Sequence, residues 1–334
     1  MKKNNKFLSF IKRYPFILAC SIIIPPLITT GQYLISSNFE IFHNDYYTGE
    51  RLDIDDSKFE LTGIKKIGKV SQTSSNYSYQ GAACYKDKYV VVLDGLEAIQ
   101  IYNSYNMKLL HHINGDFNRD WHCNQAFFGD SYYKMSDEYP LFYISMEHKN
   151  IHSTIAFRIY SRGGTYNIEE VQTIKLAFDK EEDTIYYPNS YYDFDEGLIY
   201  YGGYTENNYM RSDSNKLKYY VFSMPFYKEE YFELHTSEAL ESFELASETA
   251  TQGGFISNSH LYQTFSFGSK TDPLRAPVMR IVDLKNKTII KEYKNLGEQF
   301  GVYAEFEHLA INDQGKMISL GNPLDIYEFE YKAD

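Results

Sequence analysis

Most of the chain after residue 57 alternates between short apolar or aromatic segments and polar turns. One arrangement recurs: a polar residue opens a first strand, a polar turn follows, and a second strand begins about nine residues after the opening. Apolar segments of this length bounded by turn residues are typical of β-hairpins. The openings lie at Gln80, Gln125, Asn189, Gln252 and Glu307, with a longer turn in the copy at Gln125.

Further strand-like segments follow the hairpins, so that one unit contains about four antiparallel strands. Residues 98–103 and 108–113 follow the first hairpin, and residues 155–160 and 171–176 follow the second. Four-stranded sheets repeated around an axis are the blades of a β-propeller. The five openings therefore predict an all-β fold, a five-bladed β-propeller.

The last unit has room for only three strands, at residues 309–312, 317–320 and 326–331. Residues 59–70 precede the first unit and also have a strand-like pattern. We expect this N-terminal strand to complete the last blade and close the ring, because closure removes an exposed sheet edge.

One segment departs from the β pattern. Residues 236–250 begin with Thr-Ser, have acidic residues near their start, and place Leu240, Phe243 and Ala246 at helical spacing. This pattern predicts a short helix over the join between the third and fourth blades, with a role in packing.

Composition agrees with an all-β body, because 33 Tyr and 23 Phe suit half-buried pleated surfaces. The formal net charge is −12, yet the first 39 residues hold five basic residues and no acidic ones. The rest of the chain therefore has 28 basic and 45 acidic residues, a net charge of −17. A body this acidic repels phosphate backbones, so we expect no nucleic-acid partner.

The N-terminal segment has the features of a membrane anchor. Residues 14–39 carry no charged side chain, and Lys12-Arg13 precede them. About 20 apolar residues span the hydrocarbon core, and flanking basic residues stay in the cytoplasm. We expect the following order: a cytoplasmic basic tail at 1–13, a single-pass transmembrane signal anchor at 14–39, a linker at 40–56, and an extracytoplasmic propeller at 57–334.

Two alternatives for this segment remain open, a cleaved signal peptide and a lipoprotein signal ending at Cys20. The lipoprotein alternative is weaker because only six residues separate Arg13 from Cys20 and the apolar stretch continues beyond it. Pro25-Pro26 would kink a spanning helix, which membranes tolerate.

The other two cysteines, Cys84 and Cys123, could form one disulfide or remain as buried free thiols. Neither their spacing nor a partner motif favours the disulfide.

The first strand of each propeller blade lines the central channel, so the five openings should converge at one channel mouth. Four amides and one carboxylate suit a neutral polar ligand such as a glycan or a peptide end. The alternative is that these groups only satisfy backbone groups of adjoining blades. The expected ligand-binding residues are Gln80, Gln125, Asn189, Gln252 and Glu307, with Trp121, His122, Asn124 and Tyr187 beside them.

The sequence supports catalytic or metal-binding residues less strongly than it supports the ring of ligand-binding residues. Glu305 and Glu307 alternate along one strand and should face the same side, where they could act as the acid pair of a glycosidase. His148 and His152 have metal-like spacing but fall in a turn. The chain has no nucleotide or hydrolase signature motif, so we expect no metal and no cofactor.

The Gln-Gly openings at Gln80-Gly81 and Gln252-Gly253, together with the strand-turn-strand pattern of residues 278–293, resemble five-bladed propellers of the glutamine cyclotransferase type. That resemblance implies an enzyme that cyclises an N-terminal glutamine in a polar central pocket. The catalytic acid of that type has no match here, so the resemblance assigns no catalytic residue.

Three functions are compatible with these features. The leading expectation is a monomeric, membrane-anchored module that binds a glycan or peptide at the channel mouth. The second is an enzyme acting on a sugar or an N-terminal glutamine, with Glu305 or Glu307 as general acid. The third is a scaffold that holds another envelope protein.

Overall fold

The computed structural model describes residues 49–52, 55, 58–72, 78–115, 122–134, 136–148, 151–321 and 324–332. The expected tail, the expected anchor at 14–39, Cys20 and Trp121 lie outside these residues. By its contacts, the chain divides into two units, Met1–Tyr46 and Tyr47–Asp334, and the described residues belong to the second. Within the described parts of the chain, no helix has the length and apolar character needed to cross a membrane.

The described strands form five separate sheets. The first sheet consists of β2 (Tyr79–Tyr85), β3 (Lys88–Leu93), β4 (Ala98–Asn103) and β5 (Leu109–Asn114). The second consists of β6 (His122–Phe128), β7 (Phe142–His148), β8 (Ile151–Arg162), β9 (Thr165–Ala177) and β13 (Tyr231–His235). The third consists of β10 (Tyr186–Asp193), β11 (Leu198–Tyr204), β12 (Lys216–Ser223) and β14 (Glu241–Ala246).

The fourth sheet consists of β15 (Thr251–Ser257), β16 (His260–Phe265), β17 (Val278–Asp283) and β18 (Thr288–Tyr293). The fifth consists of β19 (Ala310–Ile311), β20 (Met317–Gly321), β21 (Asp325–Lys332) and β1 (Glu60–Lys69). Short helical turns lie in the connections: η2 (Asp94–Leu96), η3 (Glu181–Asp183), η4 (Thr236–Glu238), η5 (Pro273–Arg275) and α4 (Leu296–Phe300).

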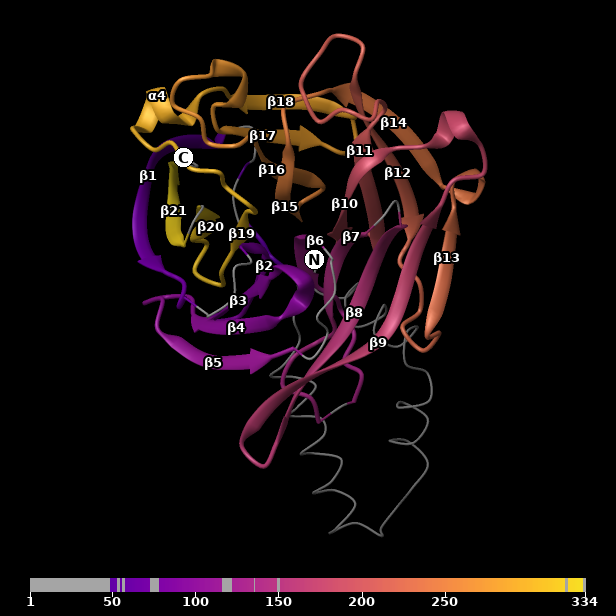
Figure 1. Ribbon diagram of the computed structural model, residues 1–334, viewed down its shortest axis with the longest axis vertical. Coiled ribbons are helices and arrows are strands. Elements are labelled where there is room, and N and C mark those ends of the chain that lie inside the picture. The colour runs from indigo at the N-terminus through magenta and orange to yellow at the C-terminus, as the bar shows by residue number, and fades with distance from the viewer. Residues whose placement is uncertain are drawn as a thin grey trace, which may run out of the picture. The chain divides into compact units, whose positions relative to one another are not determined.

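The five sheets are the blades of a propeller, numbered 1 to 5 in the order just given. Strands β2, β6, β10, β15 and β19 surround the centre of the ring and contact one another, while β5, β14, β18 and β1 lie toward its edge (Figure 1). This arrangement confirms the all-β, five-bladed architecture expected from the repeated openings.

The hydrophobic core lies between the blades. The buried apolar residues of the described chain form five clusters, and each cluster joins two adjacent blades. Between blades 1 and 2, for example, Val90 and Ile99 pack with Phe142 and Phe157. Each blade therefore buries both faces against its neighbours, as expected for a fold in which one four-stranded sheet is not stable alone.

The helix expected at residues 236–250 is wrong. Only a single turn, η4, forms there, and β14 follows it as the outer strand of blade 3, antiparallel to β12. Phe243 and Leu245 turn inward at a spacing of two, and Phe243 stacks on Tyr219 of β12 with ring centroids 5.0 Å apart. Leu240, which the helical pattern required on the buried face, is 63% exposed.

Blade 2 has a fifth strand that the sequence pattern did not predict. Strand β13 belongs to the connection between β12 and β14 of blade 3, yet it pairs in parallel with the outer strand β9 of blade 2, from Thr173 to Ala177. The two blades are therefore joined by backbone hydrogen bonds as well as by side-chain packing.

The strand expected at 59–70 is β1, and it pairs antiparallel with β21 along its length. Phe59, just before it, is fully buried and lies against Tyr262 and Tyr331 from blades 4 and 5. Cys84 and Cys123 are buried free thiols, so the disulfide alternative is excluded.

Residues Gly49–Leu52, which we call the strap, lie at the mouth where the inner strands end. The two carboxylate oxygens of Glu50 accept hydrogen bonds from the backbone N–H of Cys84 in β2, at 2.9 Å, and of Ile311 in β19, at 3.1 Å. Leu52 is buried, and its N–H donates to the Ser257 hydroxyl at 3.0 Å. The strap therefore contacts blades 1, 4 and 5 at once.

Candidate functional site

The expected site lies at the opposite mouth, where the inner strands begin. In β2, β6, β10 and β15 the pairing with the next strand shifts register near the start, with two residues opposite one. Such β-bulges re-aim side chains and are frequent beside functional sites. The shift occurs at the same place in each blade, so it provides a common reference for the five openings.

Measured from this register shift, the five openings lie at two depths. Gln80 and Gln252 directly follow the last residue paired before the shift, and Glu307 likewise follows Phe306, which bridges to Gly321. Gln125 and Asn189 are instead the first residues paired after it, two positions further into the channel. The expected single ring is therefore two layers, an outer one and an inner one.

The inner layer closes the channel. The side-chain amide of Gln125 donates to the carbonyl of Gly254 across the channel, and its oxygen accepts from the Gly254 N–H at 2.9 Å. Both polar ends of Gln125 are thus occupied, so this residue joins blades 2 and 4 and is not available to a ligand. Asn189 donates its amide to the carbonyl of Gln252 at 3.2 Å, while its own oxygen is unpartnered.

The glycine after Gln80 and the glycine after Gln252 permit this close approach. A Cβ atom at Gly81 would lie 2.9 Å from the carbonyl oxygen of Cys123, and one at Gly253 would collide with the amide oxygen of Gln125. The recurring Gln-Gly dipeptide therefore has a packing reason: Gly81 lies against the inner strand of the neighbouring blade 2, and Gly253 lies against the Gln125 side chain that crosses the channel.

The outer layer forms the floor of the mouth. Gln80, Asn124, Gln252 and Glu307 are all more than 90% buried. The amide of Gln80 donates to the Ser78 hydroxyl at 3.0 Å, and the amide of Gln252 donates to Glu305 at 3.2 Å and to the Ser266 carbonyl at 3.3 Å. The donor ends of these two amides are therefore engaged within the protein.

Several buried oxygen atoms near these amides are not engaged. Among the described residues, nine buried side-chain atoms lack a hydrogen-bond partner, and five of them lie at this mouth. They are the side-chain oxygens of Gln80, Asn124, Asn189, Ser266 and Glu307. A buried polar atom without a partner costs about 1–3 kcal/mol, so five around one opening form an unusual local concentration of unmet acceptors.

Carboxyl groups give the mouth its electrostatic character. Burial raises the pKa of Glu307 well above its ordinary value, and the nearby charges of Glu305 and Asp94 raise it further. Asp94 accepts the backbone N–H of Cys123 at 3.0 Å and lies 3.1 Å from Nδ1 of His122. Glu307 is therefore a buried carboxyl group that resists ionisation and lies near two other carboxyl groups.

Aromatic residues form one side of the mouth. Tyr187 lies edge-to-face with Tyr209, and Tyr209 with Phe267, both pairs with ring centroids 5.6 Å apart. The backbone is strained beside them, since Tyr187 and Ser266 have positive φ values of 52° and 91°. Strain at non-glycine positions is concentrated at functional sites in proteins generally.

Sequence reasoning missed Ser266, Tyr209 and Phe267. The two aromatics belong to loops, and Ser266 follows the second strand of blade 4, whereas the repeated pattern marks only the first strand of each blade. A Phe-Ser-Phe segment at 265–267, directly after a strand, is the signal that could have identified two of them.

The remaining predicted residues contribute little to metal or acid–base chemistry. His152 is buried, and burial lowers its pKa to about 4, while the side chain of His148 is outside the description. No group of three or more His, Cys, Asp or Glu side chains capable of holding a metal occurs in the described part of the chain. His308, which was not predicted, is buried and joins blades 5 and 1 through a 2.7 Å hydrogen bond with Tyr89.

Comparison with known proteins yields similarity of fold. No protein-family model and no curated protein matches the chain. The glutaminyl cyclase of Myxococcus xanthus, an enzyme of the type that the blade openings resemble, is a similar solved structure with 8% identity and a TM-score of 0.45, covering 83% of this chain and 97% of its own. Two glucose dehydrogenase structures are also similar, each with 7% identity and covering 80% of this chain and 99% of theirs, with TM-scores of 0.41 and 0.43.

Proposed function

We propose that the protein is a binding module whose channel mouth, where the inner strands begin, holds a small polar ligand or a chain end that presents several hydrogen-bond donors. The observation that carries this proposal is the cluster of unpartnered acceptor oxygens on Gln80, Asn124, Asn189, Ser266 and Glu307. A ligand bearing hydroxyl or amino groups would satisfy them, as a glycan or a peptide amino end does.

Two further features support this ligand class. The carboxyl groups of Asp94, Glu305 and Glu307 favour a neutral or positively charged ligand over an anion. The aromatic side formed by Tyr187, Tyr209 and Phe267 offers apolar surface against which a sugar ring or a peptide side chain can pack.

The test is a binding screen on glycan and peptide arrays with two matched variants. Asn124→Leu removes an unpartnered acceptor at the mouth, and Tyr139→Phe removes the unpartnered hydroxyl of a buried tyrosine between blades 1 and 2, away from the mouth. We expect Asn124→Leu to abolish binding of a ligand that the wild type retains, and Tyr139→Phe to preserve it. Retained binding in Asn124→Leu, Gln80→Ala and Gln252→Ala alike would refute the assignment.

Protein stability provides a second readout. Because Asn124 leaves a buried oxygen unpaired, its replacement by a similarly shaped apolar side chain should leave unfolding free energy unchanged or raise it by about 1 kcal/mol. A variant that is at least as stable and does not bind ligand would distinguish a functional amide from a structural one.

One observation favours a second function, an enzyme that uses Glu307 as general acid on a sugar or an N-terminal glutamine. Glu307 is a buried carboxyl group with a raised pKa near a second carboxyl group, an arrangement that is common in acid catalysis. Turnover should be measured on a panel of nitrophenyl glycosides and on a glutaminyl peptide. Any activity that survives unchanged in Glu307→Gln would exclude this role.

We also propose that β1 closes the ring and that residues 14–39 tether the propeller outside the cytoplasm. A chain truncated before Lys58 should keep a cooperative fold, whereas truncation before Val70 should lose it, because the second truncation removes the strand paired with β21. Extraction of membranes with alkaline carbonate, followed by protease treatment of intact cells, would test the anchor and its orientation.

A further inference from the structure

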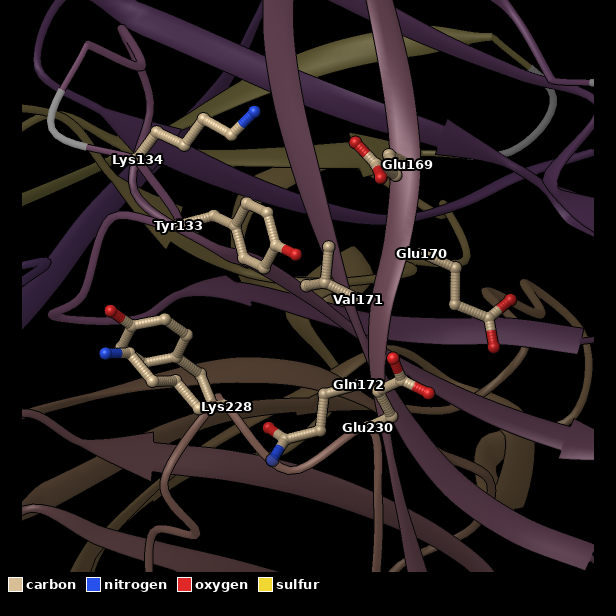
Figure 2. A pocket seen from close by; sticks show the side chains of 9 residues that line it. Tyr133, Lys134, Glu169, Glu170, Val171, Gln172, Lys228 and Glu230 are labelled. Atoms are coloured by element: carbon tan, nitrogen blue, oxygen red, sulfur yellow. The ribbon is translucent and has the colours of Figure 1, made fainter.

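The outer edge of blade 2 carries a cleft of about 770 Å³ that is separate from the channel (Figure 2). Its floor is the middle of β9, from Glu169 to Gln172. Strand β13 covers β9 only from Thr173 onward. Among the described residues, no strand pairs with the outer edge of β9 between Thr165 and Gln172.

The same edge already accepts a strand within this molecule. Strand β13 joins it in parallel, and the connection leading into β13 is fixed by a 2.8 Å hydrogen bond from the Thr173 N–H to the Glu230 carbonyl. A second extended segment continuing this line would lie in the cleft. Addition of a strand to an exposed edge is a common mode of peptide recognition.

A buried polar atom faces the cleft. Gln172 is 1% exposed and lines the floor, its amide donates to the Phe226 carbonyl at 2.9 Å, and its oxygen has no partner. An acceptor in this position suits a backbone N–H of an added strand.

The walls of the cleft differ in charge. Glu169, Glu170 and Glu230 lie on the strand side, and Tyr133 lies on the opposite side between Lys134 and Lys228 (Figure 2). The ring of Tyr133 is fixed from two directions, by Tyr227 with ring centroids 6.5 Å apart and by the Arg158 guanidinium 5.5 Å from its centroid. Arg158 is itself held by two hydrogen bonds to Asp137, at 2.6 and 2.7 Å. It also pairs with Glu169 at 3.3 Å and so neutralises part of the acidic side of the cleft.

We propose that this cleft binds an extended, lysine- or arginine-rich segment of a partner protein, which pairs with the free edge of β9 and places its basic side chains toward Glu169, Glu170 and Glu230. A second copy of this chain is disfavoured as the occupant, because the body is strongly acidic and would repel itself. The cleft would thus give the propeller a protein partner independent of the ligand at the channel mouth.

The experiment uses a fluorescein-labelled nine-residue peptide of alternating lysine and valine, with the full-length protein, in a fluorescence anisotropy titration. The control peptide has the same sequence with alternate backbone nitrogens methylated, which keeps the charge and removes the donors along one edge. We expect the methylated peptide to bind at least tenfold more weakly. Equal binding of the two peptides would overturn strand addition, because charge attraction would then account for all of the binding.

Matched protein variants locate the binding. Glu169→Gln with Glu230→Gln should weaken binding about fivefold or more, whereas the same neutralisation in the exposed turn η3, Glu181→Gln with Glu182→Gln, should leave it unchanged. Equal losses in the two double variants would overturn the assignment to the cleft. Asn124→Leu should bind the peptide normally, so failure at the channel mouth and failure here are distinguishable.

Hydrogen exchange gives a readout that does not depend on affinity. The bound peptide should slow exchange of the amides of residues 165–172 and leave those of β14, the outer strand of blade 3, unaffected. Absence of protection at 165–172 under saturating peptide would refute the proposal. Wild-type dimers in sedimentation that dissociate in the Glu169→Gln, Glu230→Gln variant would show instead that this edge pairs with a second copy of the chain.

Discussion

Glu50 of the strap should make the protein less stable as the pH rises through neutrality. Burial raises the pKa of its carboxyl group from 4.5 to about 8, although backbone N–H groups of Cys84 and Ile311 act in the opposite direction. A carboxyl group whose pKa is higher in the folded than in the unfolded protein stabilises the fold below pH 4.5, and this contribution is lost as the pH rises to about 8.

The size of the loss in unfolding free energy follows from the pH range between the unfolded and folded pKa values of Glu50. Each pKa unit corresponds to about 1.36 kcal/mol, so the part of this range between about pH 6.5 and 8 corresponds to about 2 kcal/mol. Glu50 as a whole residue is only half-buried, which reduces the expected loss of unfolding free energy to between about 1 and 2 kcal/mol.

Urea unfolding at pH 6.5, 7.5 and 8.5, at constant ionic strength, would measure this loss. The lowest pH, 6.5, limits the contribution of His152 and His308 to the measured change. Their pKa values are lowered to about 4 and 3 in the folded protein, so they make stability rise with pH mainly below their ordinary pKa of 6.5. The highest pH, 8.5, stays below the ordinary cysteine pKa of 9.0, which limits the contribution of thiol ionisation in the unfolded protein.

The comparison is between the wild type and Glu50→Gln. The glutamine cannot ionise, so the stability of the variant should change less with pH. One of the two backbone N–H groups would then face the glutamine NH₂ group, another donor, which should cost about 1 kcal/mol at every pH. The test is therefore how steeply the unfolding free energy falls with pH in each protein, and not the constant difference between the two proteins. Parallel slopes in the two proteins would refute the reasoning. Glu307 and Asp193 also have raised pKa values, and Glu307→Gln serves to separate the contribution of Glu307.

Three further predictions concern the remaining buried polar groups. Gln125→Leu should lower the unfolding free energy by about 2–4 kcal/mol in urea titrations, because it leaves the N–H and carbonyl of Gly254 unpaired inside the channel; a loss below about 0.5 kcal/mol would contradict the bridging role. Arg280→Met should cost about 3–5 kcal/mol in calorimetry, because Arg280 is 1% exposed and neutralises Glu292 and Glu248; a matched Arg275→Met change on the surface should cost little. In a Cys20→Ser background, Cys84 and Cys123 should react with Ellman's reagent only on unfolding, because both thiols are buried and burial raises their pKa values; fast labelling of the native protein would show that the strap opens readily.

The repeated hairpins could be predicted because each depends on residues close in sequence. The openings, the turn residues and the alternation of β2 with β3 are all local, and they indicated the number of blades correctly. Residues 241–246 were misassigned for a related reason, since Phe243 fits both a spacing of three from Leu240 and a spacing of two from Leu245. Pairing with β12 favours the second pattern.

The rest depended on contacts between residues distant in sequence. Parallel pairing of β13 with β9 joins Tyr231 to Thr173, and nothing in either segment specifies the other. The two depths at the channel mouth arise from register shifts that become visible only once strands are paired. Glu50 was assigned to a linker because its partners, the N–H groups of Cys84 and Ile311, come from opposite ends of the chain.

The strap has a mechanical consequence for a propeller pulled from its N-terminal end. Tension reaching Gly49–Leu52 meets the bonds of Glu50 and Leu52 to blades 1, 5 and 4 before it reaches β1. Force would therefore be distributed over three blades before the β1–β21 seam begins to shear. Loss of the Glu50 contacts would transfer the tension to the pairing of β1 with β21.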